Sequence, residues 1–194
     1  MHKTDTLNKA HEQIKNNLNF TNKQTQKFIE WVLESSNFEI EDFINLVKQI
    51  KSKTNYCHLC GDICEETLCF ICSDPDRDKI LMVVDNNKAI NKFEELRFFT
   101  GKYYIFSTDI DIEKNEELFL HNLEKLSNYA KNFDEVIIAI SPNLKGEIIS
   151  YNIKKQLYEN KISVSQLAIG IPIGANVDFV DPVTLRESIK NRTK

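Results

Sequence analysis

From residue 79 onward, short apolar runs alternate with longer stretches in which apolar residues recur every three or four positions. The short runs are typical of buried parallel strands, which we expect at 80–84, 103–106, 136–140 and 163–167. The longer stretches predict helices over 88–96, 116–131, 146–158 and 182–190. Strands and helices that alternate in this order predict a small α/β domain with a mainly parallel sheet flanked by helices.

The first 54 residues have a different pattern, because they are polar overall and contain no alternating strand signal. The apolar residues within 28–33 fit a helix that packs on one broad side. A further helix is predicted by apolar residues at spacings near three and four, namely Phe38, Ile40, Phe43, Ile44, Val47 and Ile50. A helical region therefore precedes the α/β domain.

All five cysteines of the chain lie between these two regions, within residues 57–72. Cys57, Cys60, Cys69 and Cys72 form two Cys-x2-Cys pairs, and each pair can present two thiolates from one tight turn, as a tetrahedral zinc site requires. Buried or redox-active cysteines are the alternative. Cys64 stands between the pairs and is interpreted as a free or core thiol. Four thiolates leave no open coordination position, so a zinc ion here is expected to be structural and not catalytic.

Composition narrows the class of protein. Hydrophobic residues make up 41% of the 194 residues, which is enough for a folded core. No apolar run reaches the length of a membrane span, and the polar, lysine-rich N-terminus does not resemble a secretory signal, so we expect a cytoplasmic protein. The net charge of -4 does not indicate a nucleic-acid-binding protein, although a local basic patch remains compatible with it.

The carboxyl ends of the predicted strands are where chemistry would sit in a sheet of this kind. Asp85 follows the first strand and Glu147 follows the third, with the cationic Lys145 beside it. A Mg²⁺ site for phosphotransfer would need several converging carboxylates, and only these two are available. Asp109 and Asp111 follow the second strand in a polar stretch that is interpreted as a solvated loop.

Taken together, these motifs resemble the bacterial recombination mediator family RecR. The cysteine cluster with Ser73-Asp74-Pro75 is similar to the family's Cys-x2-Cys-x8-Cys-x2-Cys-Ser-x-Pro zinc finger. Segment 83–85 resembles the first strand of the family's Toprim domain, and 141–147 resembles its Asn-Pro-Thr-x-Glu-Gly-Glu turn. The tail segments 168–174 and 181–185 are similar to the family's C-terminal signature.

The resemblance implies a domain order, and we expect the chain to follow it. Residues 1–54 would be a helical region with a degenerate helix-hairpin-helix, and 55–76 a four-cysteine zinc finger that holds one structural Zn²⁺. Residues 77–169 would be a Toprim-like α/β domain, and 170–194 a C-terminal tail that takes part in oligomerisation.

Several positions depart from the family pattern. The hairpin motif Pro-Gly-x-Gly-x-Lys corresponds here to 18–23, where both glycines are missing. Asn19 tolerates a positive φ angle, whereas the β-branched Thr21 does not easily do so. Lys145 replaces a family Glu, and Asp85 replaces another Glu of the same acidic face.

The resemblance implies a non-catalytic DNA-binding protein of recombinational repair. It would act with RecO- and RecF-type partners at single-stranded or gapped DNA, as a homo-dimer or tetramer. Lys23 and Lys27 match basic positions of the DNA-binding motif, and Asp85 and Glu147 belong to the Toprim face that meets the partner. Ordinary surface lysines are the alternative for Lys23 and Lys27. Two other functions stay open: a metal-dependent Toprim nuclease or topoisomerase-like enzyme, and an interaction scaffold without DNA binding.

Overall fold

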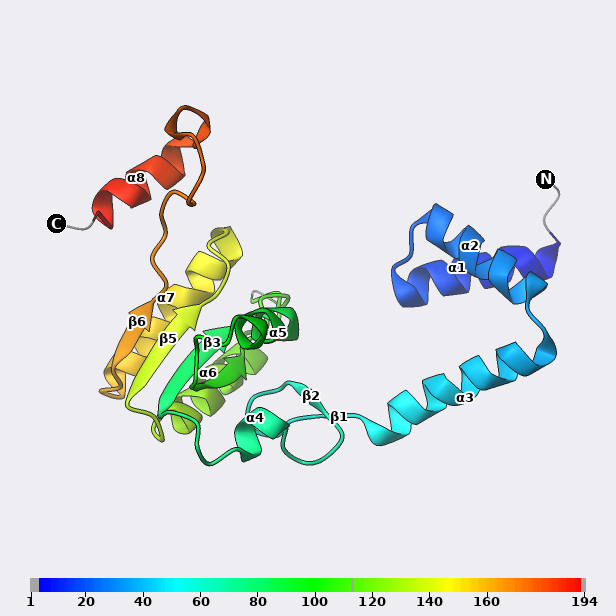
Figure 1. Cartoon of the computed structure of the whole chain (residues 1–194), viewed down its shortest axis with the longest axis horizontal. Helices are drawn as coiled ribbons and strands as arrows, with labels where there is room; N and C mark the ends of the chain where they lie inside the picture. The colour runs from blue at the N-terminus through cyan, green and yellow to red at the C-terminus, as the bar shows by residue number, and fades with distance from the viewer. Residues whose placement is uncertain (1–3, 113, 193–194) are drawn as a thin grey trace. The chain divides into compact units, whose positions relative to one another are not determined.

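The structure is a computed structural model that describes residues 4–112 and 114–192 (Figure 1). Contacts within the chain divide it into two compact units, Met1–Thr54 and Asn55–Lys194. The first unit contains only helices among its described residues, and the second contains the cysteine cluster, the sheet and the tail. The finer division of the second unit at residues 76 and 169 stays a prediction.

The first unit consists of three helices, each of which starts at a hydroxyl side chain. These helices are α1 (Asp5–Leu18), α2 (Asn22–Glu34) and α3 (Asn37–Lys53). Thr4, Thr21 and Ser36 each accept a hydrogen bond from a backbone N–H of the first turn. For α2 and α3 a side chain three residues on bonds back to the cap, which satisfies two otherwise unpaired donors.

In the turn between α1 and α2, Asn19 and Thr21 stand where the family motif has glycines, and each takes a different backbone conformation. Asn19 takes the left-handed conformation, with φ of 52° and ψ of 36°, and it ends α1. Thr21 keeps φ at −66° and caps α2, so the β-branched residue never meets the strained region. Asparagine tolerates left-handed geometry better than most residues, which explains how the hairpin closes without glycine.

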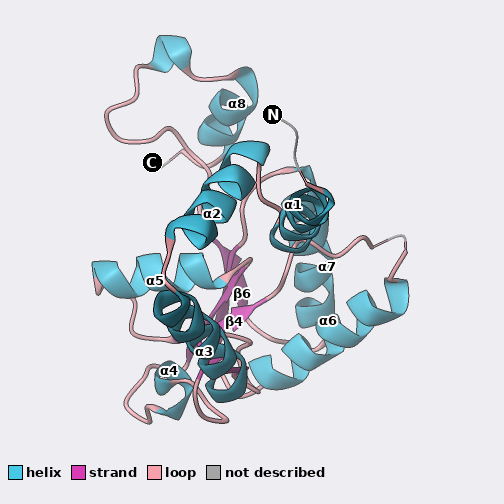
Figure 2. Cartoon of the chain, turned by 90° about the vertical axis from the view of Figure 1, so that its right-hand side faces the viewer, coloured by secondary structure: helices cyan, strands magenta, loops and turns pink. Residues whose placement is uncertain are grey.

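The second unit is built on four parallel strands in the order β4-β3-β5-β6. These strands are β3 (Ile80–Val84), β4 (Lys102–Ile105), β5 (Glu135–Ala139) and β6 (Val164–Gln166). Three helices connect them, α5 (Asn87–Leu96), α6 (Glu116–Ala130) and α7 (Leu144–Glu159), and they flank the sheet (Figure 2). The predicted fold class, a helical region followed by a parallel α/β sheet, is confirmed.

Alternating strand residues separate two cores on the two faces of the sheet. Leu81 and Val83 point into the larger core, which α6 and α7 cover with Leu123, Leu126 and Ile149 among others. Met82 and Val84 point to the opposite face, where α5 and the four cysteines pack. Burial on both faces explains why β3 is a continuous apolar run.

The cysteine segment is a small module at the edge of the sheet. It contains a two-stranded antiparallel ladder, β1 (Asn55–Tyr56) with β2 (Ile63–Cys64), and a single helical turn, α4 (Phe70–Ser73). The backbone N–H of Ile105 in β4 donates to the carbonyl of Cys60 at 2.8 Å, which fixes the module to the outer strand. The edge of β4 is therefore covered, as exposed strand edges in stable proteins usually are.

The tail leaves the sheet after β6 and ends in a short helix. It contains a 3₁₀ turn, Val177–Phe179, and α8 (Pro182–Lys190), whose N-terminus is capped by Asp181. Ile173 and Phe179 are almost fully exposed. None of the helices in the described part of the chain is long and apolar enough to cross a membrane.

Candidate metal centre and the edge of the sheet

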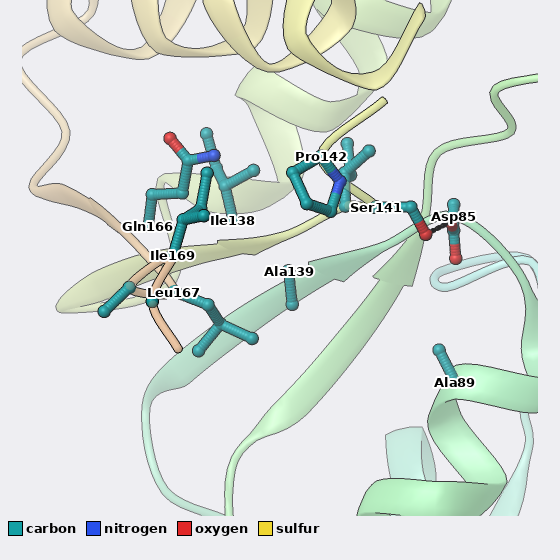
Figure 3. A pocket seen from close by; sticks show the side chains of 12 residues that line it. Asp85, Ala89, Ile138, Ala139, Ser141, Pro142, Gln166, Leu167 and Ile169 are labelled. Carbon is teal, nitrogen blue, oxygen red and sulfur yellow. Dashed lines mark hydrogen bonds between the residues drawn. The ribbon is translucent and has the colours of Figure 1, made fainter. Parts of the chain in front are cut away.

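The carboxyl ends of β3 and β5 bring Asp85 next to Ser141. The hydroxyl of Ser141 donates to Asp85 Oδ2 at 2.6 Å (Figure 3). The amide of Asn86 donates to Asp85 Oδ1 at 2.9 Å. Both carboxylate oxygens are thus engaged by donors from the chain. A hollow of about 380 Å³ opens beside this pair, with mainly apolar walls that include Ile138, Pro142 and Leu167.

Glu147 lies in the first turn of α7, and its side chain is exposed. Asn143 caps this helix by accepting a hydrogen bond from the backbone N–H of Gly146 at 2.9 Å. Gly146 cannot carry a side chain here, because a Cβ atom would lie 2.0 Å from the carbonyl oxygen of Ser141. The turn after β5 is therefore tightly closed, and it presents Glu147 and the exposed Lys145 to solvent.

The carboxylates of the sheet edge do not assemble into a metal site. Within residues 4–112 and 114–192, only cysteines form a group of three or more metal-ligating side chains with close ligand atoms. Asp109 and Asp111 lie exposed in the loop after β4, as expected for a solvated stretch. Asp111 pairs there with Lys114 at 3.2 Å.

Lys23 and Lys27 lie four residues apart on α2, so they occupy the same side of the helix. Both side chains are exposed, and the buried Thr25 lies between them in sequence. The structure thus brings these two cations together at the surface of the first unit, one turn after the hairpin that Asn19 closes.

The four cysteines of the two Cys-x2-Cys pairs meet in one buried cluster. The sulfur atoms of Cys57, Cys60, Cys69 and Cys72 all lie within 4.8 Å of one another, and these residues are at most 6% exposed. The sulfurs of Cys60 and Cys69 are 3.5 Å apart. Four sulfur donors at this spacing can hold one metal ion, and they are the donor set that tetrahedral Zn²⁺ prefers.

Each pair is shaped by a tight turn whose backbone points at a sulfur. In the first turn Gly61 takes φ of 81°, and the N–H of Asp62 donates to Cys60 Sγ at 3.4 Å. In the second turn, Cys69 caps α4, and its Sγ atom accepts a hydrogen bond from the backbone N–H of Cys72 at 3.4 Å. Donors aimed at sulfur stabilise the thiolate form, which is the form that ligates a metal.

The electrostatics of the cluster also fit a cation. The hydrogen bond between Cys60 and Cys72, together with burial, raises the pKa of the Cys60 thiol, while the same bond lowers the pKa of Cys72 to about 6. Burial raises the pKa of Cys69 to about 12. Neighbouring buried thiolates repel one another, so a bound divalent cation is what would allow all four to ionise.

Cys64 is separate from the four sulfurs that converge, and its interpretation as a free or core thiol stays a prediction. Its side chain is half-buried at the end of β2, and its sulfur donates to the carbonyl of Glu66 at 2.9 Å. It does not belong to the group of four whose ligand atoms converge.

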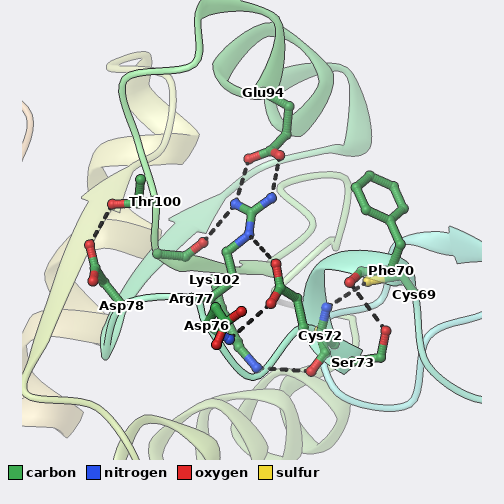
Figure 4. Close-up of polar contacts among 12 residues, drawn as sticks. Cys69, Phe70, Cys72, Ser73, Asp76, Arg77, Asp78, Glu94, Thr100 and Lys102 are labelled. Atoms are coloured by element: carbon green, nitrogen blue, oxygen red, sulfur yellow. Dashed lines mark hydrogen bonds and ion pairs between the residues drawn. The ribbon is translucent and has the colours of Figure 1, made fainter.

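A polar network attaches the cysteine module to the sheet (Figure 4). The ammonium of Lys102 in β4 donates to the carbonyl of Cys72 at 2.9 Å. Arg77 binds both carboxylate oxygens of Glu94 in α5, at 2.9 and 2.5 Å, and it also donates to the carbonyl of Gly101 at 3.1 Å. The Tyr103 hydroxyl donates to the same carboxylate at 2.7 Å.

The sequence did not reveal this network, because its bonded residues lie 9 to 30 residues apart and share no spacing rule. A charged residue directly after the cysteine module, such as Arg77, is the only local signal of it. The hydrogen bonds from Arg77 lower the pKa of Glu94, against the opposing effect of burial. A bidentate pair that is mostly shielded from water stabilises more than an exposed one.

We predict that Arg77→Met lowers the free energy of unfolding by about 2 kcal/mol at pH 7, since it leaves Glu94 without its partner in a partly buried position. The pKa of Glu94 is lowered in the folded state, so this contribution is complete above about pH 4.5 and is lost as the pH falls through the lower folded pKa. Urea unfolding at pH 7 and in acid measures both effects.

The exposed pair Lys190–Glu187 provides the control, because Lys190→Met should change stability by less than about 0.5 kcal/mol. An Arg77→Met protein as stable as the unaltered chain at pH 7 would show that the Arg77–Glu94 pair does not stabilise the fold.

Similarity to known proteins covers most of the chain. A family model described as RecR, C-terminal, matches residues 170–193, which include α8. The chain is 36% identical over 170 residues to the recombination protein RecR of Mycoplasmopsis pulmonis (strain UAB CTIP), which covers 88% of each chain. It is 30% identical over 173 residues to the RecR protein of Clostridium perfringens (strain 13 / Type A), with 88% and 87% covered. Since this similarity extends over most of both chains, the protein belongs to the RecR family of recombination proteins.

Proposed function

We propose that the chain is a recombination mediator that binds single-stranded or gapped DNA and catalyses no reaction itself. As a RecR protein it acts in recombination and DNA repair. The proposal that the chain is not catalytic rests on the sheet edge, where the carboxylate of Asp85 accepts hydrogen bonds from Ser141 and Asn86. A carboxylate that accepts two hydrogen bonds and belongs to no group of three or more converging ligands among the described residues is poorly placed to hold Mg²⁺.

We further propose that the metal at the cysteine cluster is one Zn²⁺ per chain, ligated by Cys57, Cys60, Cys69 and Cys72. Four buried sulfurs and no other donor favour zinc over the oxygen-seeking Mg²⁺ and Ca²⁺. The ion would act on structure only, since four thiolates complete its coordination. In small zinc modules such binding contributes about 10–16 kcal/mol toward folding.

The purified chain is expected to contain one zinc per molecule by elemental analysis, and Cys69→Ser should lose most of it. Cys64→Ser is the matched control, because it removes a thiol from the same module that is not one of the four converging sulfurs. Loss of zinc in the Cys64 variant and not in the Cys69 variant would reverse the ligand assignment. A folded wild-type chain with clearly less than one zinc would remove the zinc proposal.

Lys23 and Lys27 are proposed to contact DNA phosphates. They form an exposed pair on one side of α2, close in sequence to the hairpin. The absence of both hairpin glycines removes the closest backbone approach to a phosphate, so side-chain cations would carry more of the binding. Such contacts make affinity depend strongly on salt, because each neutralised phosphate releases counterions.

We predict that Lys23→Ala with Lys27→Ala weakens binding to single-stranded DNA and reduces the slope of log affinity against log salt by about 1.4, since each lost contact contributes about 0.7. Fluorescence anisotropy over a salt series measures both quantities. Native mass measured on the same sample relates binding to the dimer or tetramer that we propose.

The double variant Lys88→Ala with Lys92→Ala controls for charge, because it removes two exposed lysines with the same spacing on α5. Equal losses in the two double variants would mean that the contacts are not specific to α2. Oligomers without any DNA affinity would favour a pure interaction scaffold. DNA cleavage with Mg²⁺ or Mn²⁺ that disappears in Glu147→Gln would favour the nuclease alternative.

The face around Asp85 and Glu147 is proposed to bind a RecO-type partner, with a RecF-type protein as a further partner of the assembly. Glu147 is exposed at the start of α7, where it is free to meet a basic partner surface. Lys145 lies two residues away and adds the opposite charge, so the partner surface would have to present charges of both signs.

Glu147→Lys should weaken association with the RecO-type protein of the same organism by about tenfold at low salt, and by less at high salt, as expected for a charge at the rim of an interface. Titration calorimetry at two ionic strengths measures this. Glu159→Lys makes the same charge change at the other end of α7 and should bind normally. Similar losses in both variants would point to overall charge instead of this face.

A further inference from the structure

One of the four cluster sulfurs has a contact from far along the chain. The Sγ atom of Cys72 lies 3.9 Å from the hydroxyl oxygen of Tyr129, which is 57 residues away in α6. This is a hydrogen-bond distance for sulfur, whose larger radius lengthens such contacts. The contact joins the cysteine module to a helix that belongs to the larger core of the sheet.

The ring of Tyr129 is held in place by two aromatic neighbours. Its centroid lies 6.0 Å from that of Tyr104 in β4 and 5.0 Å from that of Phe133, the latter in an edge-on arrangement. Edge-on and tilted aromatic pairs of this kind fix ring orientation as well as bury area. The hydroxyl of Tyr129 therefore meets Cys72 from a fixed direction.

Cys72 is thus held at two of its atoms by elements outside the module. Lys102 in β4 binds its carbonyl oxygen at 2.9 Å, and Tyr129 in α6 contacts its sulfur. Its own N–H donates to Cys69 Sγ at 3.4 Å, which joins it to the second ligand of the same pair. A shift of the Tyr129 hydroxyl would therefore act directly on a ligand atom.

The direction of this hydrogen bond follows from the metal. A thiolate that ligates a cation has no proton to give, so it only accepts, whereas a tyrosine hydroxyl donates. Hydrogen bonds from outside the ligand set orient metal ligands and commonly strengthen metal binding. We propose that Tyr129 is an outer hydrogen-bond partner of the metal centre, which donates to the Cys72 thiolate and slows release of the ion.

This inference rests on the proposed zinc at the four cysteines, and Tyr104 offers a matched comparison. Tyr104 is a partly buried tyrosine whose ring packs against Tyr129, and its hydroxyl makes no hydrogen bond to a cysteine within the described ranges. Tyr129→Phe and Tyr104→Phe each remove one hydroxyl from the same aromatic group. Only the first removes a contact with a ligand of the cluster.

The experiment uses the full zinc-loaded chain and follows zinc release to an excess of a colorimetric chelator. Tyr129→Phe is expected to release zinc about tenfold faster, near the lower end of what such outer partners contribute. Tyr104→Phe should release it at the wild-type rate. Equal rates for Tyr129→Phe and wild type, or equal acceleration in both variants, would overturn the proposal in favour of simple packing.

Replacing zinc with Co²⁺ gives a second, spectroscopic measurement, which would not change if Tyr129 contributed only packing. In Co²⁺-loaded protein the loss of a hydrogen bond raises the energy of the sulfur electrons, so the thiolate-to-cobalt charge-transfer band of Tyr129→Phe should move to longer wavelength. An unmoved band would count against the hydrogen bond. The zinc content of the unaltered chain is measured first. A chain that contains no zinc would contradict the zinc proposal itself. A zinc-loaded chain from which Tyr129→Phe releases zinc at the wild-type rate would contradict only the proposed role of Tyr129.

Discussion

The mutual approach of four buried sulfurs is the constraint on which the second unit depends. Cys57, Cys60, Cys69 and Cys72 pack against the face of the sheet that carries Met82 and Val84, so the cluster is part of one of the two cores. Four ionised thiolates in such a place would repel one another strongly, and the module around them has only two short strands and one helical turn. A cation at their centre would remove the repulsion and supply the cohesion that so small a segment cannot obtain from apolar burial.

The cluster can shape the sheet because its backbone is bonded to the outer strand. Cys60 accepts the N–H of Ile105, and Cys72 accepts the ammonium of Lys102, so both cysteine pairs are attached to β4. Arg77, directly after the module, contacts Asp74 of the module at 3.7 Å and binds Glu94 of α5. The cysteine module therefore covers part of this edge. It satisfies the backbone N–H of Ile105, which would otherwise face water or another chain.

Sequence patterns predicted the elements whose residues repeat at a fixed period. The four strands and the helices of the second unit lie within a few residues of their predicted positions. The helix after β5 starts at Leu144, two residues before its predicted start, because Asn143 caps it and the closed turn needs Gly146 inside the first turn. The pairing of Arg77 with Glu94, the contact between Tyr129 and Cys72, and the hydrogen bond from Ser141 to Asp85 could not be predicted. Each joins residues on different elements, and only the tertiary fold sets those distances.

Each of the two surfaces proposed for binding lacks one feature. The hairpin has no glycine that would let a phosphate approach its backbone, and the carboxylates of the sheet edge form no metal site among the described residues. In the hairpin, Asn19 supplies the left-handed residue that a glycine would otherwise provide, but a side chain there keeps a ligand farther from the backbone. At the sheet edge, Ser141 and Asn86 occupy the oxygens of Asp85, so its charge remains while its coordination sites are taken. What is left at each place is exposed charge, from Lys23 and Lys27 on one unit and from Lys145 and Glu147 on the other. Exposed charge recognises partners through complementarity and responds to salt, which is the behaviour expected of the two binding surfaces that we propose.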